Sequence, residues 1–253
     1  MTTFAQISDC HLFATDTGKH FDALVYPQLI SVLQQIKCQP EIEFIIFTGD
    51  LSQDHSAQSY QWFNQAFVDT GITCPVYYLA GNHDEPKLFS RYLTHSVFEP
   101  NKTIEVGRWQ LQLLDSKSET PAGVLSDTQL DRIASSNKTK FQFLLMHHHP
   151  IDVGYFIDRH GLKNQEQLWL ELAELPHVKA ISCGHVHRAM SLSIPDGHCH
   201  PLKLFSCPAT SITFGMHDSE LIAQYDQIGY RRFTLYSDGN LTSSTHYIEA
   251  ITS

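Results

Sequence analysis

Clusters of Asp, Asn and His follow five short apolar segments of the chain. Side chains of these types can bind metal ions or transfer protons, and each cluster begins where an apolar segment ends. The clusters are Asp9-Cys10-His11, Gly49-Asp50, Gly81-Asn82-His83-Asp84, His147-His148-His149-Pro150 and Gly184-His185-Val186-His187. One such cluster would carry little information. Five clusters with the same chemistry predict a shared functional site.

The apolar segments predict buried β-strands, because they are short and rich in β-branched and aromatic residues. They span residues 4–8, 44–48, 76–80, 141–146 and 178–183. Ligands of α/β sheets bind outside the carboxyl ends of the strands. We therefore expect the five polar clusters to meet at one edge of the fold. Gly49, Gly81 and Gly184 each directly precede a polar residue of a cluster, where the chain must turn sharply and approach the site closely.

Seven side chains in these clusters are candidate metal ligands. They are Asp9, His11, Asp50, Asn82, His147, His185 and His187. Carboxylate, amide and imidazole donors suit divalent ions such as Fe, Mn or Zn. Seven donors are too many for one tetrahedral zinc with an open position, but a bridging Asp50 would divide them into two sets of four. Two ions about 3.5–4 Å apart can stabilise both the attacking and the leaving oxygen of a phosphoryl displacement.

The same motifs resemble those of the calcineurin-like metallophosphoesterases. The matching motifs are Asp9-x-His11, Gly49-Asp50, Gly81-Asn82-His83-Asp84, His147 and Gly184-His185-x-His187. The surrounding segments 49–54, 147–150, 157–164 and 176–179 further resemble bacterial class III cyclic AMP phosphodiesterases. The resemblance extends from Phe4 to about Tyr247.

This resemblance implies an α/β fold, a four-layer αββα sandwich of two mixed sheets flanked by helices. It also implies two divalent metal ions per chain (Fe, Mn or Zn). The first ion would be held by Asp9, His11, Asp50 and His187, and the second by Asp50, Asn82, His147 and His185. The implied reaction is hydrolysis of 3′,5′-cyclic AMP to 5′-AMP by a metal-bound hydroxide.

Five residues are expected to contact the substrate: His11, Asp50, Asn82, His83 and His187. His83 lies beside Asn82 without being a predicted ligand, and we expect it to bond the phosphate or to protonate the departing ribose 3′ oxygen. The alternative role of His83 is to support the motif structurally.

Three further assignments stay open at this stage. His148 is an alternative ligand to His147, because a shift of one residue along a strand reverses the side-chain direction. Asp158, His160 and Asn164 of segment 157–164 could line the mouth of the substrate pocket. Their spacing does not show whether their side chains face the substrate. Asp84 immediately precedes a predicted helix, so N-capping is a sufficient explanation for its carboxylate.

Length and composition favour one domain, residues 1–253, because no repeat, low-complexity tract or long linker divides the chain. The chain has 17 Lys and Arg against 27 Asp and Glu, a net charge of −10. This charge disfavours a nucleic acid polymer as partner but is compatible with a small cyclic nucleotide attracted to metal ions. No segment is long and apolar enough for a membrane span. The six cysteines form no CxxC pair, which favours a cytoplasmic location.

Between the predicted strands, apolar residues recur with helical spacing at 26–37, 56–68, 126–135 and 165–175. Asp54 or Ser56 is expected to cap the second helix, and Ser126 to begin the third. Residues 195–197 and 237–240 predict hairpin tips. Early βαβ units followed by a β-meander suit two sheets packed face to face.

Two other functions are compatible with the same motifs. One is a phosphodiesterase for glycerophosphodiesters, or one of broad specificity, that uses the same metals. The other is a non-catalytic scaffold on the same fold. The complete ligand set argues against the scaffold, because burying seven polar side chains in one crevice is costly without a metal to bind.

Overall fold

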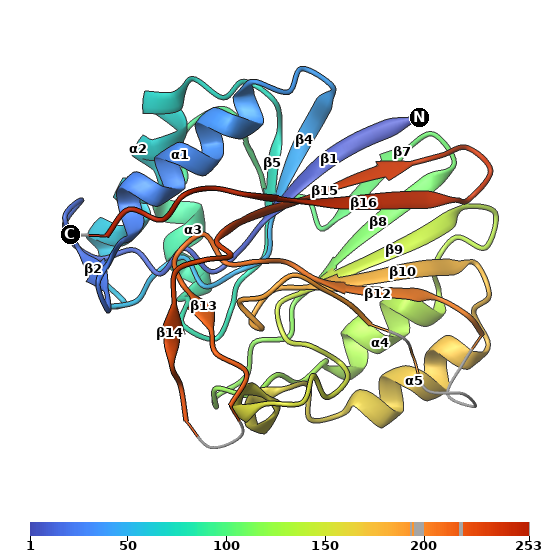
Figure 1. Ribbon diagram of the computed structural model, residues 1–253. Helices are drawn as coiled ribbons and strands as arrows, with labels where there is room; N and C mark the ends of the chain where they lie inside the picture. The colour runs from blue at the N-terminus through green and yellow to red at the C-terminus, as the bar shows by residue number, and fades with distance from the viewer. Residues whose placement is uncertain (193, 195–199, 218–219, 253) are drawn as a thin grey trace.

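The computed structural model describes residues 1–192, 194, 200–217 and 220–252 (Figure 1). Two six-stranded mixed sheets form its centre. The first has the strand order β16-β15-β1-β4-β5-β6 and the second β11-β12-β10-β9-β8-β7. Two small hairpins, β2 (Lys19–His20) with β3 (Ala23–Leu24) and β13 (Thr213–Phe214) with β14 (Ala223–Gln224), lie outside these sheets.

In the first sheet, β1, β4, β5 and β6 run parallel, and the hairpin of β15 and β16 adds antiparallel to β1. The strands of this sheet are β1 (Thr2–Ile7), β4 (Ile42–Phe47), β5 (Val76–Tyr78), β6 (Phe98–Glu99), β15 (Gly229–Leu235) and β16 (Leu241–Tyr247). The tip between the last two strands is the hairpin predicted at residues 237–240. The hairpin tip predicted at 195–197 lies outside the described residues.

In the second sheet, four central strands run parallel and the two edge strands run antiparallel. Its strands are β7 (Thr103–Val106), β8 (Trp109–Leu114), β9 (Phe141–Met146), β10 (Val178–Cys183), β11 (Met190–Leu192) and β12 (Lys203–Ser206). The predicted strands at 141–146 and 178–183 coincide with β9 and β10.

Helices cover the outer face of each sheet, so that the molecule has four layers (Figure 1). The helices over the first sheet are α1 (Val25–Lys37), α2 (Ala57–Thr70) and α3 (Pro86–Tyr92), and those over the second are α4 (Asp127–Ala134) and α5 (Gln165–Ala173). A 3-10 helix, η1 (Phe156–His160), precedes α5. The predicted αββα sandwich of two mixed sheets is confirmed. Within the described part of the chain, every helix is too short or too polar to span a bilayer.

Aromatic side chains fill the space between the two sheets. Phe4 on β1 stacks against Phe44 on β4 at 5.2 Å and against Phe233 on β15 at 5.1 Å between ring centroids. Phe143 on β9 meets Phe233 edge-on at 5.0 Å and thereby joins the second sheet to the first. All four side chains are buried, and such aromatic contacts contribute more than the burial of their area alone. This packing fixes the two sheets relative to each other.

Two helices begin at serines that the sequence identified as caps. Ser56 caps α2, because its side chain accepts a hydrogen bond from the backbone N–H of Ser59, and Ser126 caps α4 in the same way. Asp54 does not cap α2. Its carboxylate accepts from the backbone N–H groups of Ala14 and Ser56 and so ties the loop before α2 to the loop after β1.

Candidate metal centre

The five polar clusters come together where the carboxyl ends of β1, β4 and β5 in one sheet meet those of β9 and β10 in the other. Seven predicted ligands follow these five strands. Six of them are buried, and Asn82 is partly exposed. The packed sheets therefore bring together side chains that lie far apart along the chain.

Most of the predicted ligands have a left-handed backbone, which non-glycine residues rarely adopt. The φ angles are 56° for Asp9, 46° for His11, 56° for Asp50, 64° for His185 and 57° for His187. Each such residue costs on the order of 1–3 kcal/mol and persists only where the surrounding structure enforces it. Five of them at one site indicate that the fold maintains this strain for a function.

Two glycines allow the strand ends to approach each other. A Cβ atom on Gly81 would lie 2.1 Å from Oδ1 of Asp50, and one on Gly184 would lie 2.1 Å from Oγ of Ser8. Neither distance is possible between real atoms. The expectation that glycines before the ligands permit a close approach is confirmed at these two positions.

The first set of predicted ligands forms a compact group of donor atoms. Nε2 of His11 lies 3.1 Å from Nε2 of His187 and 3.8 Å from Oδ2 of Asp50. Nε2 of His187 lies 3.4 Å from Oδ1 of Asp9. The other ring nitrogens face acceptors, with Nδ1 of His11 2.7 Å from Oε1 of Gln53 and Nδ1 of His187 2.9 Å from the Ile212 carbonyl. These contacts direct the Nε2 lone pairs toward one another.

The second set is arranged around His147. Its Nε2 atom lies 3.0 Å from Oδ1 of Asn82, 3.1 Å from Nδ1 of His185 and 3.3 Å from Oδ2 of Asp50. Its Nδ1 atom lies 2.8 Å from the Thr48 carbonyl, which orients the ring in the same way as in the first set.

Asp50 belongs to both sets through the same oxygen. Oδ1 accepts a hydrogen bond of 2.9 Å from the backbone N–H of His83, and Oδ2 faces His11 on one side and His147 on the other. Metal–ligand distances of about 2.0–2.2 Å place neighbouring donors of one ion roughly 3.0–3.6 Å apart. The donor atoms lie in or close to this range. The residues therefore fit two ions that share Asp50.

The electrostatics of the site favour bound cations. Burial alone would raise the pKa of Asp50, but the His147 and His11 rings outweigh burial and hold this pKa well below its usual value. Burial lowers the pKa of His147, but the charge of Asp50 outweighs it and raises this pKa to about 9. Burial keeps the pKa values of His11 and His185 far below their usual value, so these rings are neutral. Neutral imidazoles and an ionised carboxylate are the forms that bind metals, so His11, His185 and Asp50 are ready to bind, whereas His147 would have to lose a proton when an ion binds.

Asp84 does not cap α3, whose N-cap is Glu85. Its carboxylate instead accepts from the backbone N–H groups of Asp50 and Gly81, both at 2.8 Å, and from that of Leu51 at 2.9 Å. Burial and the charge of Asp50 raise the pKa of Asp84 to about 7. The expectation of an N-cap was wrong, because the loop after Asn82 folds back onto the loop after β4. Asp84 holds these two ligand-bearing loops together.

The open choice between His147 and His148 is clarified by their neighbours. Nδ1 of His148 lies 2.8 Å from Oγ of Ser116, and its Nε2 lies 3.2 Å from the Pro121 carbonyl. Both of its nitrogens therefore have partners outside the predicted ligand sets, whereas Nε2 of His147 faces three other predicted ligands, including the bridging Asp50. The geometry favours His147.

His83, His55 and His20 lie outside the predicted ligand sets but close to the first of them. The His83 ring is 5.0 Å from the His11 ring and stacks on the His55 ring at 5.7 Å. His20 lies on β2. Its ring is 4.8 Å from that of His11, and its Nδ1 atom is buried without a hydrogen-bond partner. No pattern identifies His20 in the sequence, because only the folding of the β2–β3 hairpin brings it there.

Two polar residues of segment 157–164 use their side chains to form hydrogen bonds with backbone groups of the surrounding loops. The Asp158 carboxylate accepts from the backbone N–H groups of Val153 and Gly154, both at 2.8 Å. Asn164 both donates to and accepts from the backbone of Leu125. His160 ends η1 and is half-buried.

Comparisons with known proteins identify the family of the chain. A family model of calcineurin-like phosphoesterases matches residues 2–189. A probable cyclic nucleotide phosphodiesterase of Colwellia psychrerythraea is 48% identical over 244 residues, which cover 95% of this chain and 93% of that protein. The 3′,5′-cyclic adenosine monophosphate phosphodiesterase CpdA of Escherichia coli strain K12 is 34% identical over 249 residues, which cover 95% of this chain and 88% of that protein.

A solved structure shares the fold at low sequence identity. A dimetal phosphatase from Danio rerio superimposes with a TM-score of 0.70 at 14% identity, covering 99% of this chain and 98% of that one. This likeness concerns the fold alone.

Proposed function

The chain belongs to the calcineurin-like phosphoesterase family, and from this premise we propose that it hydrolyses 3′,5′-cyclic AMP to 5′-AMP. The observation that carries the proposal is the pair of donor sets that share Asp50. The names of the relatives from Colwellia psychrerythraea and Escherichia coli support the narrowing from phosphoric esters to cyclic nucleotides.

The first ion would be held by Asp9, His11, Asp50 and His187, and the second by Asp50, Asn82, His147 and His185. Bound there, divalent ions would lower the pKa of a water molecule and offset the charge on the phosphoryl oxygens. The mixed nitrogen and oxygen donors suit Fe, Mn or Zn. Carboxylate and amide oxygens alone would favour Mg or Ca, so it is the histidine ligands that favour Fe, Mn or Zn.

His83 would act on the departing oxygen. Its backbone N–H is bonded to Asp50, so its side chain starts from a fixed point beside the bridging carboxylate. Its Nδ1 atom is buried and has no protein partner. Burial lowers the pKa of His83, which favours the neutral ring. The neutral imidazole N–H would donate to a phosphoryl oxygen, and the ring would have to gain a proton to protonate the ribose 3′ oxygen as the P–O bond breaks.

A hollow of about 260 Å³ next to the site would take the rest of the nucleotide. It is lined by His55, Asn82, His83, Lys117, Ser118, Glu119, Thr120 and Pro121. Its volume lies close to the lower end of the roughly 300–1,000 Å³ typical of small-molecule sites, which suits a mononucleotide. With a net charge of −10, the chain as a whole would not attract a nucleic acid polymer.

A cytoplasmic location is part of the same proposal. The five cysteines in the described ranges, Cys10, Cys38, Cys74, Cys183 and Cys207, form no disulfide. Free thiols are the normal state in a reducing compartment.

A substrate panel tests the proposal. Metal-free protein would be reconstituted separately with Fe(II), Mn(II) and Zn(II), and kcat/KM measured for cyclic AMP, cyclic GMP, 2′,3′-cyclic AMP and glycerophosphocholine. We expect the highest kcat/KM with 3′,5′-cyclic AMP. A preference for glycerophosphocholine would establish the glycerophosphodiesterase instead, and no turnover of any substrate with both ions bound would indicate a scaffold.

A further inference from the structure

We infer that Lys117 is a positioning residue that organises the metal centre through a single peptide group. The inference rests on the proposed two-metal function. Lys117 lies in the loop after β8, and its ammonium donates a hydrogen bond of 2.9 Å to the carbonyl oxygen of Asn82. The nitrogen of the same peptide group, that of His83, donates a hydrogen bond of 2.9 Å to Oδ1 of Asp50. One peptide group thus connects a cation to the bridging carboxylate.

The two hydrogen bonds reinforce each other. An ammonium that binds a carbonyl oxygen withdraws electron density from the peptide group, so the N–H at its other end becomes a stronger donor. That N–H holds Oδ1 of Asp50 and leaves Oδ2 facing His11 and His147. Lys117 therefore stabilises the bridging orientation of Asp50 without touching it.

The same peptide group carries two other residues of the site. Asn82 precedes it and places its Oδ1 atom 3.0 Å from Nε2 of His147. His83 follows it and places its ring beside that of His11. Asn82 has an ordinary backbone conformation, so the left-handed strain that constrains Asp9 or His11 does not constrain it. An external hydrogen bond from Lys117 supplies this constraint instead.

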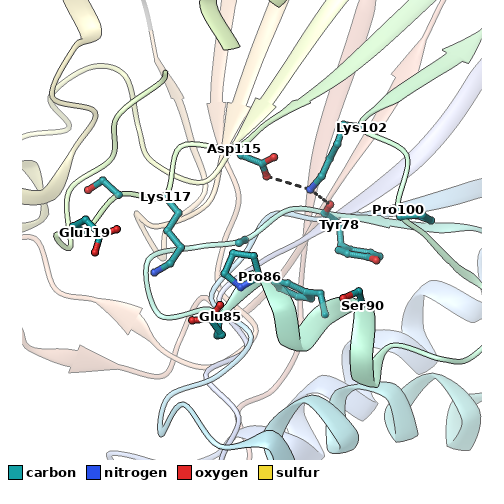
Figure 2. Close-up of a pocket in the computed structure, with 12 residues that line it drawn as sticks. Tyr78, Glu85, Pro86, Ser90, Pro100, Lys102, Asp115, Lys117 and Glu119 are labelled. Carbon is teal, nitrogen blue, oxygen red and sulfur yellow. Dashed lines mark hydrogen bonds and ion pairs between the residues drawn. The ribbon is translucent and has the colours of Figure 1, made fainter. Parts of the chain in front are cut away.

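The position of Lys117 suits this role. Its side chain is half-buried and extends from its loop toward the segment that carries Glu85 and Pro86, along the wall of a cavity of about 730 Å³ (Figure 2). It also lines the smaller hollow beside His83. Lys117 therefore forms part of the boundary between the site and the larger cavity.

Lys102 offers a matched control in the same cavity. Its ammonium also donates to a backbone carbonyl, that of Tyr78, at 2.9 Å, and it pairs with Asp115 at 3.1 Å (Figure 2). None of these partners is a predicted ligand. Replacing either lysine removes one positive charge and one hydrogen bond to a carbonyl, but only Lys117 connects to the metal centre.

The test measures metal binding by the intact chain without substrate. Metal-free wild-type, Lys117→Met, Lys117→Arg and Lys102→Met proteins would be titrated with Co(II), followed by the visible absorption of the ion. We expect Lys117→Met to weaken binding of one Co(II) about 10–100-fold, the usual effect of losing a residue that orients a ligand. Lys117→Arg should retain most of the affinity, and Lys102→Met should bind Co(II) as the wild type does.

Two results would overturn the inference. The first is an unchanged Co(II) titration for Lys117→Met, which together with a raised KM for cyclic AMP would make Lys117 a substrate contact. The second is an equal loss of Co(II) affinity in Lys102→Met, which would show that the effect comes from the lost charge alone. If Lys117→Met does not fold, Lys117→Gln keeps a donor without the charge and should show a smaller loss of affinity.

The titration also separates the two proposals. A specific loss of Co(II) affinity together with no hydrolysis of cyclic AMP by the wild type would support Lys117 as a positioning residue and reject the proposed substrate. Hydrolysis of cyclic AMP by the wild type, with unchanged Co(II) affinity in Lys117→Met, would support the proposed substrate and reject Lys117 as a positioning residue.

Discussion

The two predicted ligand sets are held in place by different means. Apart from the shared Asp50, all three residues of the first set, Asp9, His11 and His187, have a left-handed backbone. In the second set only His185 does, whereas Asn82 and His147 have ordinary conformations. The first set is thus fixed mainly by strained turns at strand ends. Hydrogen bonds from outside orient residues of both sets, but Asn82 and His147 have no strained turn and depend on their bonds with Lys117 and Thr48.

This difference predicts that substitutions around the site will weaken metal binding by the two sets to different extents. A strained turn is enforced by the packing of both sheets and does not depend on any single side chain. A hydrogen bond to a ligand is lost with one substitution. We therefore expect the second set to be the more sensitive of the two to changes in the residues around it.

The largest effect is expected from removing the shared residue. In Asp50→Ala both sets lose a donor and the negative charge between them, so both ions should bind weakly and turnover should fall about 10³-fold or more. Elemental analysis of gently purified protein should approach two transition-metal ions per chain in the wild type and far fewer in the variant. A fully active Asp50→Ala protein would contradict the two-metal assignment.

Replacing His83 should separate chemistry from metal binding, because His83 belongs to neither set. His83→Ala should keep its metal content, since the backbone N–H that holds Asp50 remains. Its kcat should fall about 10²–10⁴-fold for cyclic AMP. The loss should be smaller for bis(p-nitrophenyl) phosphate, whose leaving group needs little protonation.

Equal losses for both substrates would instead assign His83 to stabilising charge on the phosphate. A collapse of metal content would make it a ligand or a support of one.

Asn82→Ala tests whether the two sets act independently. Only the second set loses a donor, so a metal titration should show one site at wild-type affinity and one weakened about 10–100-fold. Asp9→Ala is the matched variant and should weaken the other site. If either variant lost both ions to the same extent, the two sets would be one cooperative unit, and the comparison drawn above would not hold.

The smallest effect is expected from Gln53, whose Oε1 atom accepts from His11 in the first set. Because the left-handed turn at His11 already directs the ring, Gln53→Ala should weaken metal binding less than Lys117→Met does, by about 10-fold or less. The same Co(II) titration compares the two variants directly. A larger loss in Gln53→Ala would show that backbone strain does not protect the first set.

Much of the architecture could be predicted from local patterns. Short apolar segments identified β9 and β10 to the residue, and serine caps identified the starts of α2 and α4. The ligand clusters were visible because each follows a strand directly. In all these cases the informative residues lie within one turn or one strand of each other.

Asp84 shows where this local reasoning fails. Read along the chain, it precedes a helix and resembles a cap, but its hydrogen bonds go to Asp50 and Leu51, more than thirty residues earlier. His20 and Lys117 were not identified at all, because each reaches the site from a loop or short hairpin without a motif of its own.

The sequence by itself determined which side chains could bind metals and which strands carry them, because residue type and strand pattern are local properties. Only the tertiary structure decided that Asp50 presents one oxygen to both ligand sets. It also decided that Asp84 joins two loops and that Lys117 bonds the Asn82 carbonyl across 35 residues of chain. These contacts depend on how two sheets pack and how their connecting loops cross, which no periodicity in the chain encodes.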